Sequence, residues 1–243
     1  MNRGEVLVER CPTGMSGFDD LCSGGFVRNS VSAVMGGPGA GKTIFLLQFL
    51  YNGVTKYKEN GMYISFEPDV VELFKDAMVF GWDMEKLDQK GQIKFMKISP
   101  LTDVEELKKE LTKMISKNEV KRICIDPISF FGATEKTDGK VREILFDLTA
   151  MLKRLGVTTL LANETATTDS EEVGIAASDI RGQYVKFLVD AVIDIYSSGL
   201  GGVSDRAVRV AKMRRTNHVR GPVPMEISDD GISVSKKSKK GML

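Results

Sequence analysis

The chain has 243 residues, of which 42% are hydrophobic, and its 34 basic and 33 acidic side chains leave a net charge of +1. This length and apolar content fit one α/β domain with a substantial core and exclude a disordered chain. The balanced charge argues against a dedicated nucleic-acid binder, which usually carries a clear basic excess.

The three cysteines are widely spaced without a CxxC pair, and the chain contains a single histidine. These features argue against a zinc site and indicate a reducing compartment. No apolar run approaches the roughly 18 residues that a membrane span needs, and no secretory signal is recognisable. We therefore expect a cytoplasmic protein without a membrane segment.

Short apolar runs alternate with amphipathic stretches from residue 31 to residue 163. We expect buried strands at 31–35, 62–66, 93–98, 122–126 and 157–163. We expect helices at 42–60 closing at Gly61, at 70–82, at 102–118 behind a capping box of Thr102 and Glu105, and at 141–155 stopping at Gly156. Strands that alternate with helices predict an α/β fold with a mostly parallel central sheet flanked by helices.

From about residue 184 the pattern changes. Residues 188–218 read as strand, Gly-rich turn and strand, and residues 223–234 as a further hairpin. The sheet should therefore finish with antiparallel C-terminal hairpins. We expect a single domain over residues 1–235, and residues 236–243 should form a short basic, disordered tail.

The stretch GGPGAGKT at 36–43 fits the P-loop pattern G-x-x-x-x-G-K-[ST] and lies between a predicted strand and a predicted helix. Its glycines let successive backbone N–H groups point at a phosphate, where the helix dipole also favours negative charge. Lys42 should reach the β- and γ-phosphates, and the Thr43 hydroxyl should help to hold Mg²⁺. The pattern predicts an ATP site whose contacts are Gly36, Gly37, Gly39, Ala40, Gly41, Lys42, Thr43 and Ile44.

Acidic and polar residues follow three other predicted strands. Asp126 ends the apolar run RICID, as the metal-supporting acid of a P-loop protein does. Glu67 follows MYISF, and a carboxylate there should point into the ligand crevice and activate water. Asn163 and Glu164 end a further strand, where they could sense the γ-phosphate or hold a loop.

The most basic short stretch is KMRRTNH at 212–218. In a strand, side chains alternate between two faces, so Lys212, Arg214, Thr216 and His218 would project together, followed by Arg220. Such a row could grip a nucleic-acid backbone, a nucleotide phosphate or an acidic patch on a neighbour.

Several linked motifs resemble the KaiC-like branch of the RecA ATPase superfamily. They are PTGMSGFDDL at 12–21, YISFEPD at 63–69, and KMRRTNH followed by GPVPMEISDDGISV up to residue 234. The resemblance covers residues 12–235 and only one such domain fits. It implies a RecA-like P-loop fold, ATP hydrolysis with Mg²⁺, and a homo-oligomeric ring, usually a hexamer, with nucleotide between subunits.

The resemblance also implies roles in trans for the basic stretch. Lys212 and Arg214 would approach the γ-phosphate held by the neighbouring subunit. Thr216, His218 and Asp229 would approach its ribose and base. A cation beside the developing phosphoryl charge can be worth about 10³-fold in rate.

The sequence departs from the family pattern at two sites. Many relatives carry paired acids where this chain has Glu67 and Pro68, so hydrolysis here could be weak. Relatives often have glycine where Arg215 stands, and Arg215 would lie on the opposite face of a strand from Arg214. Autophosphorylation known in the family uses a Ser-Thr pair, but Lys186 and Phe187 stand at the corresponding positions, so no autokinase activity is expected.

The leading hypothesis is an ATPase ring that couples nucleotide state to the binding of a partner protein. A second hypothesis is a RecA- or RadA-like DNA-binding factor acting through loops at 131–140 and 164–182. The second loop is acidic, which argues against it because phosphate neutralisation dominates DNA affinity. A third is a nucleotide-sensing scaffold with very weak hydrolysis, suggested by Pro68.

Overall fold

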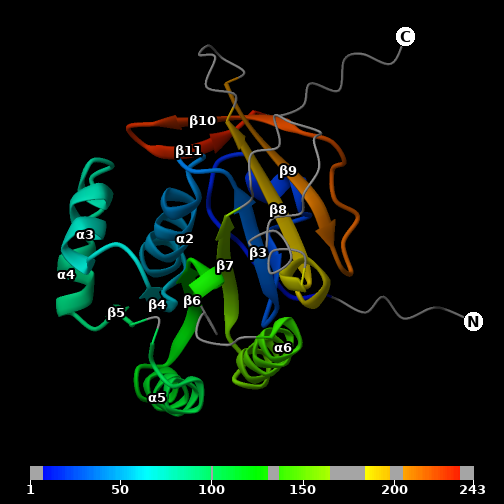
Figure 1. The fold of residues 1–243 in the computed structure, drawn as a ribbon. Coiled ribbons are helices and arrows are strands. Elements are labelled where there is room, and N and C mark those ends of the chain that lie inside the picture. The colour runs from blue at the N-terminus through cyan, green and yellow to red at the C-terminus, as the bar shows by residue number, and fades with distance from the viewer. Residues whose placement is uncertain (1–7, 100, 131–136, 165–183, 198–204, 236–243) are drawn as a thin grey trace, which may run out of the picture.

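The computed structural model describes residues 8–99, 101–130, 137–164, 184–197 and 205–235. The basic tail at 236–243, and most of the two loops considered for DNA contact, lie outside these residues. The described part of the chain is built around a nine-stranded sheet, with the strand order β11-β10-β9-β8-β3-β7-β6-β4-β5 (Figure 1). A separate two-stranded sheet pairs β1 (Arg10–Cys11) with β2 (Phe26–Val27).

The strands of the large sheet run in the directions that the sequence predicts. The parallel strands are β3 (Val31–Gly36), β4 (Asn60–Ser65), β5 (Ile93–Lys97), β6 (Val120–Asp126), β7 (Thr158–Glu164) and β8 (Ala191–Ser197). The antiparallel strands are β9 (Arg206–Met213), β10 (Val223–Ser228) and β11 (Gly231–Val234). The predicted α/β fold with antiparallel C-terminal strands is therefore confirmed.

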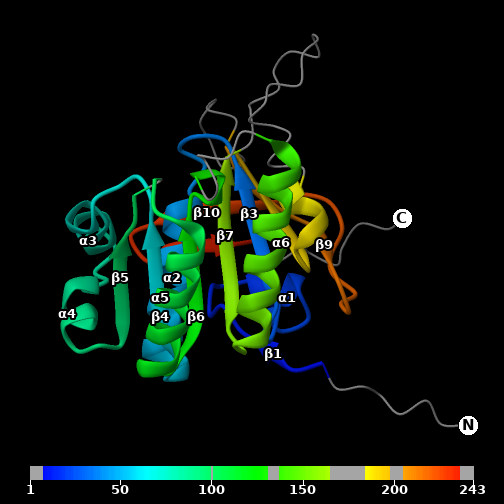
Figure 2. The same cartoon turned by 60° about the horizontal axis from the view of Figure 1, so that its bottom comes forward.

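Helices cover both faces of the sheet and enclose two cores (Figure 2). The helices are α1 (Phe18–Leu21), α2 (Lys42–Tyr57), α3 (Val70–Met78), α4 (Met84–Gln89), α5 (Val104–Lys117), the short 3-10 helix η1 (Ile128–Phe130) and α6 (Asp138–Arg154). One core buries Val34 against α2, and the other buries Ala33 and Met35 on the side of α5 and α6. This division follows from the alternation of side chains along a strand.

Several predicted helix boundaries are wrong by a few residues. The α5 N-cap is Asp103 instead of Thr102, because the Asp103 carboxylate accepts a hydrogen bond from the backbone of Glu106. Helix α2 ends at Tyr57, where Lys58 turns left-handed, and Gly61 lies inside β4. The helix expected over 70–82 ends at Met78, since the chain turns left-handed at Gly81, and a separate helix, α4, begins after Asp83, whose carboxylate caps it.

The second strand expected within residues 188–218 is present, but its expected continuation to residue 218 is wrong. Strand β9 ends at Met213, and Arg215 has a left-handed backbone with a φ of 57°. A left-handed residue interrupts the two-residue alternation of a strand. Arg214, Thr216 and His218 therefore do not continue one face of β9, although Lys212 lies within it.

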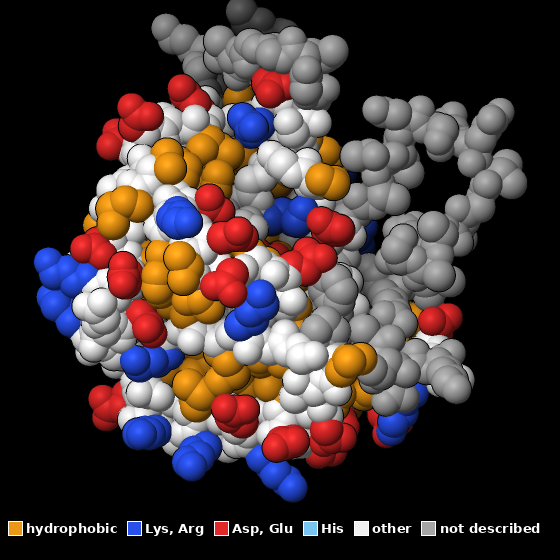
Figure 3. Space-filling model, turned by 60° about the vertical axis from the view of Figure 1, so that its left-hand side comes forward, with side chains coloured by type: hydrophobic (Ala, Val, Ile, Leu, Met, Phe, Trp, Pro, Cys, Tyr) orange, Lys and Arg blue, Asp and Glu red, His pale blue; other side chains and the backbone are white. Residues whose placement is uncertain are grey.

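One side of the molecule exposes apolar side chains on α3. Val71 and Met78 are 56% and 51% exposed, and Val79, just after the helix, is 74% exposed. On the side that carries α3 and α4, hydrophobic patches lie between charged side chains (Figure 3). Exposed apolar groups on one helix provide surface that another molecule can cover. None of the helices described here is long and apolar enough to cross a membrane.

A buried charge cluster attaches α2 to β6 at the amino-terminal edge of the sheet. The Arg122 side chain is fully buried, and its Nε donates to Glu59 Oε2 over 2.6 Å. Its Nη1 donates to the Phe49 carbonyl over 3.1 Å, and its guanidinium lies 4.6 Å from the Phe49 ring centroid. Gly53 is required beside it, since a Cβ there would lie 2.6 Å from Arg122 Cδ. Arg28 donates to the other oxygen of Glu59 over 2.7 Å.

We expect Glu59→Gln to destabilise the fold by about 3 kcal/mol at pH 7, because it leaves the buried Arg122 charge without a carboxylate. Burial alone would raise the pKa of Glu59, but Arg122 and Arg28 outweigh it and hold the pKa below its ordinary value of 4.5. The ionised carboxylate therefore stabilises the fold above pH 4.5, and this contribution is lost as the pH falls through the folded-state pKa. Urea unfolding of both proteins at a series of pH values measures the difference, which should be constant near neutrality and shrink in acid. An equal free energy of unfolding at pH 7 would contradict this expectation.

Candidate active site

The loops that follow four parallel strands meet at the carboxyl edge of the sheet. They enclose a cavity of about 410 Å³ that is lined by residues of the P-loop and by Glu67, Asp126 and Glu164. Ligands of open parallel sheets bind at this edge, because the helix N-termini and the strand ends point there. The structure therefore brings the predicted P-loop and the three predicted acids together.

The P-loop leaves the start of α2 open to an anion. Gly41 is the N-cap of α2, with a φ of 106° and no side-chain hydrogen bond to the helix. Backbone N–H groups at such an uncapped N-terminus can bind a phosphate. A Cβ at Gly41 would lie 2.8 Å from Ile227 Cδ1, so the Ile227 side chain would have to move to admit a larger residue. The β10–β11 hairpin thus packs directly under the P-loop.

Lys42 is buried and bends back onto its own loop. Its ammonium donates to the carbonyls of Gly36 and Gly37, over 2.9 Å in each contact. Burial lowers the pKa of Lys42, while the carboxylates of Glu164 and Asp126 act in the opposite direction. The lysine is therefore positioned beside the P-loop with a charge that phosphate oxygens would stabilise further.

Asp126 is the centre of the hydrogen bonds in the cavity. Its Oδ2 accepts from the Thr43 hydroxyl over 2.7 Å and from the Tyr63 hydroxyl over 2.6 Å. Burial, followed by the Asp126 carboxylate, raises the pKa of Tyr63 well above its ordinary value of 10.0. Tyr63 therefore stays protonated and continues to donate to Asp126. Strand β6, which carries Asp126, is separated from the P-loop strand β3 by β7.

Thr43 and Asp126 have the chemistry that Mg²⁺ requires. They place a hydroxyl and a carboxylate oxygen 2.7 Å apart at the base of the cavity. Within the described residues there is no group of three or more acidic, histidine or cysteine side chains around a possible metal. Mg²⁺ at a P-loop takes few ligands from the protein and the rest from phosphates and water. The residues present therefore fit this ion.

Glu67 and Glu164 reach the cavity from different strands. The backbone on either side of Glu67 is held in place, since Phe66 N donates to the Asp126 carbonyl over 3.0 Å and the Ser65 hydroxyl to the Pro68 carbonyl over 2.8 Å. Glu164 ends β7 directly opposite Gly36 in the register of the sheet. Two exposed carboxylates therefore face the same space.

The basic segment, residues 212–218, lies at the opposite side of the sheet from the P-loop, where the parallel strands begin. The backbone N–H of Arg214 donates to the Asp190 carbonyl, just before β8, whereas Gly36 is opposite Ile195 of the same strand. Five residues of strand separate the two positions by roughly 16 Å. The amine of Lys212 donates to the carbonyls of Lys186 and Val189, over 3.0 and 2.7 Å. Lys212 and Arg214 therefore do not enter the cavity of their own chain.

The structure also shows the surroundings of Thr216, His218 and Asp229, the other residues expected to act in trans. The Thr216 hydroxyl accepts from Arg10 over 2.7 Å, and His218 Nδ1 lies 3.2 Å from the Val219 carbonyl. Asp229 stands in the turn between β10 and β11, beside Gly231, which packs against Trp82. Asp229 is thus at the P-loop end of the sheet, away from the other four residues.

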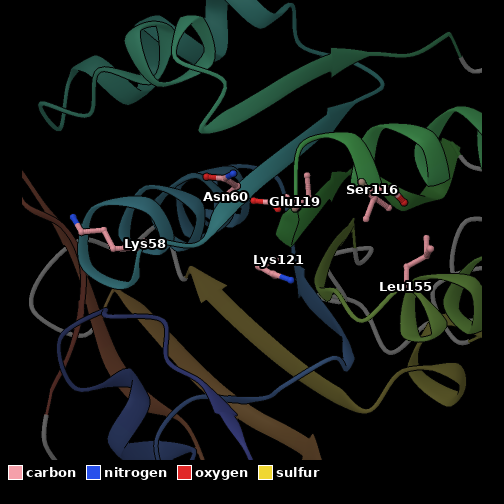
Figure 4. Close-up of a pocket in the computed structure, with 8 residues that line it drawn as sticks. Lys58, Asn60, Ser116, Glu119, Lys121 and Leu155 are labelled. Atoms are coloured by element: carbon pink, nitrogen blue, oxygen red, sulfur yellow. The ribbon is translucent and has the colours of Figure 1, made fainter.

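A second cavity, of about 390 Å³, lies at the amino-terminal edge between the starts of β4 and β6 and the ends of α5 and α6 (Figure 4). The figure shows Lys58, Lys121 and Glu119 around it, together with Asn60 and Ser116. It shares no residue with the P-loop cavity. It is therefore not part of the candidate active site.

Sequence reasoning missed Tyr63 altogether. A tyrosine within the apolar run MYISF is expected only to fill the core. The hydroxyl reaches Asp126 because β4 and β6 are neighbours in register, with Tyr63 opposite Cys124. A buried tyrosine normally finds a hydrogen-bond partner, and this was the one available signal.

Comparisons with known proteins agree with this geometry. A family described as "ATPase: KaiC" matches residues 11–239. The circadian clock oscillator protein KaiC of Parathermosynechococcus lividus is 33% identical over 236 residues, which are 93% of this chain and 42% of that protein. The KaiC protein of Nostoc sp. is 33% identical over 236 residues, with 93% and 44% covered. The chain thus spans less than half the length of these curated relatives.

A solved structure matches almost end to end. It is the crystal structure of a KaiC-like protein from the hyperthermophilic archaeon Pyrococcus horikoshii OT3, with a TM-score of 0.80 and 30% identity. The match covers 94% of this chain and 99% of that chain. It confirms the RecA-like arrangement of sheet and helices.

We expect Tyr63→Phe to raise the Mg²⁺ concentration needed for nucleotide binding by about 10-fold, because Asp126 loses the hydroxyl that orients it. A Mg²⁺ titration of ATP binding at fixed ATP concentration measures the effect. Tyr51→Phe is the matched control, since the Tyr51 ring stacks on Trp82 away from Asp126. An unchanged Mg²⁺ requirement in the Tyr63 variant would show that Tyr63 serves packing alone.

Proposed function

This chain belongs to the KaiC family of ATPases, and we propose that it hydrolyses ATP to ADP and phosphate in a homo-oligomeric ring, with each nucleotide held between two subunits. The observation that carries the proposal is the joint placement of Lys42, Thr43 and Asp126 around one cavity, with Glu67 facing it. The family supports nucleotide chemistry. The specific reaction and the ring are our inference.

The residues of the cavity have distinct roles in this proposal. Lys42 exchanges the carbonyls of Gly36 and Gly37 for phosphate oxygens, and the N-terminus of α2 contributes its N–H groups. Thr43 and Asp126 would hold Mg²⁺, which neutralises charge that develops on the transferred phosphoryl group. Glu67 accepts a proton from the attacking water, since its position at the end of β4 leaves it exposed within the cavity.

The position of the basic segment supports action in trans. Arg214 is roughly 16 Å along the strand from Gly36, which is farther than an arginine side chain extends. Lys212 is nearer, but its amine is held by the carbonyls of Lys186 and Val189. Within the described residues no hydrogen bond or ion pair is formed by the Arg214 side chain, which is exposed. This placement supports a role for Arg214 at the cavity of another copy, where the acids Glu67 and Glu164 and the bound phosphates would attract it.

Coupling to a partner protein would use α3. This helix begins immediately after the Glu67–Asp69 turn, and its Leu73 and Asp76 line the cavity. The outer surface of the same helix exposes Val71 and Met78. A change in the cavity between ATP and ADP can therefore alter a surface that a partner contacts.

We expect Glu67→Gln to lower the rate of ATP hydrolysis by roughly 10²-fold while ATP binding is kept, because the amide cannot take the proton from water. Single-turnover hydrolysis and nucleotide binding are measured on the same preparation. Glu72→Gln is the matched control, since Glu72 is exposed on α3 and does not line the cavity. Glu164→Gln is made in parallel, because Glu164 is the other carboxylate available. Equal rates in Glu67→Gln and the unmodified protein would favour a scaffold that binds ATP without using Glu67.

We expect Lys42→Ala and Arg214→Ala subunits, each inactive alone, to regain ATP hydrolysis when they are mixed. In a mixed ring, some interfaces combine an intact P-loop from one subunit with an intact Arg214 from the next. Activity is measured as the proportion of the two subunits is varied, and it should be highest near equal amounts. Rings of verified mixed composition without any recovered activity would refute the arrangement in trans.

A further inference from the structure

Arg10, in the short strand β1, forms hydrogen bonds with the segment that follows β9. Its Nη1 donates to the Thr216 hydroxyl over 2.7 Å, and its Nη2 donates to the Arg215 carbonyl over 3.2 Å. The same Nη1 lies 3.5 Å from the Gly25 carbonyl. One guanidinium thus joins β1, the turn before β2 and the segment after β9.

These hydrogen bonds extend through Thr216 to the backbone of Arg214. The Thr216 hydroxyl donates to the Arg214 carbonyl over 3.2 Å, while the Arg214 N–H donates to Asp190 over 2.9 Å. Both backbone groups of Arg214 are therefore hydrogen-bonded. One is tied to the start of β8, and the other is tied through Thr216 to Arg10.

The conformation of this segment requires such support. Arg215 has a φ of 57°, a left-handed conformation that costs energy for a residue with a side chain. Its carbonyl accepts the second donor of Arg10. Further along, Val219 N donates to the Leu21 carbonyl over 2.9 Å, so the segment follows the N-terminal part of the chain instead of the sheet.

We propose that Arg10 is a positioning residue for the reaction in the neighbouring subunit: by bonding to Thr216 and to the carbonyl of the left-handed Arg215, it sets the direction in which the Arg214 side chain projects from the protein. This inference rests on the proposed function, because it requires Arg214 to act in trans. In this inference, the Arg215 carbonyl and the Thr216 hydroxyl both serve as hydrogen-bond acceptors for Arg10 of the same chain. Arg10 does not line the P-loop cavity of its own chain.

The chemistry explains why an arginine is suited to this position. A planar guanidinium presents donors in a fixed fork, so it holds two acceptors at a defined separation, which a lysine ammonium does not. A displacement of about 1 Å in a group that stabilises charge can cost on the order of 10²-fold in rate. Loss of Arg10 should therefore lower kcat with little change in KM, because the affected contact forms chiefly in the transition state.

The test is a complementation experiment with full-length subunits. Arg10→Gln alone should lower kcat by roughly 10- to 100-fold. Mixed with Lys42→Ala subunits, it should regain activity, because its P-loop is intact and its partner supplies a correctly directed Arg214. Arg10→Gln mixed with Arg214→Ala subunits should not regain activity, because neither subunit supplies a correctly directed Arg214 side chain. Arg154→Gln, which removes an exposed arginine at the end of α6, is the matched control and should retain activity.

A second variant removes the same hydrogen bond between Arg10 and Thr216 by changing its acceptor. Thr216→Val removes the acceptor for Arg10, and it should fall in the same complementation group as Arg10→Gln. The double variant should lose little more activity than either single variant, whereas independent roles would multiply the two losses. Multiplied losses, or a failure of Lys42→Ala to rescue Arg10→Gln, would overturn the positioning role. Failure of the mixture of Lys42→Ala with Arg214→Ala would instead remove the arrangement in trans on which this inference rests.

Discussion

The buried guanidinium of Arg122 joins the two elements on which the candidate active site depends. Arg122 belongs to β6, and its hydrogen bond to the Phe49 carbonyl and its contact with the Phe49 ring fix α2 against that strand. Glu59 compensates its charge over 2.6 Å. Nearer the start of α2 and at the end of β6, the Thr43 hydroxyl donates to Asp126 over 2.7 Å. A hydroxyl and a carboxylate can keep that spacing only while α2 and β6 keep their relative position.

The residues of the proposed reaction lie at opposite ends of the strands of the sheet. The carboxyl edge carries the P-loop, Asp126 and the two exposed glutamates, whereas the amino edge carries the cationic segment that ends β9. No single chain can bring these edges together, because the length of the strands separates them. In the ring that we propose, one edge would meet the opposite edge of the next copy, because heterologous contacts whose rotation closes generate rings.

Much of the fold was predictable because its signals are local. The alternation of apolar runs with amphipathic helices predicts the parallel sheet, and the P-loop is identified by residues that are adjacent in the sequence. The helix boundaries that proved wrong were decided by competing local signals. Asp103 caps α5 in preference to the adjacent Thr102, and the chain turns left-handed at Lys58 three residues before Gly61.

The sequence by itself determined the P-loop, the acids at the strand ends and the family of the chain, because each depends on a few residues at fixed spacing. Only the tertiary structure decided how Tyr63 is used, because the bond to Asp126 depends on the order of strands in the sheet. It likewise decided the path of residues 214–219, where contacts with Arg10 and Leu21, distant in sequence, replace the regular alternation of a strand. Periodicity reports which face of an element is buried, but it contains no information about a partner some 200 residues away.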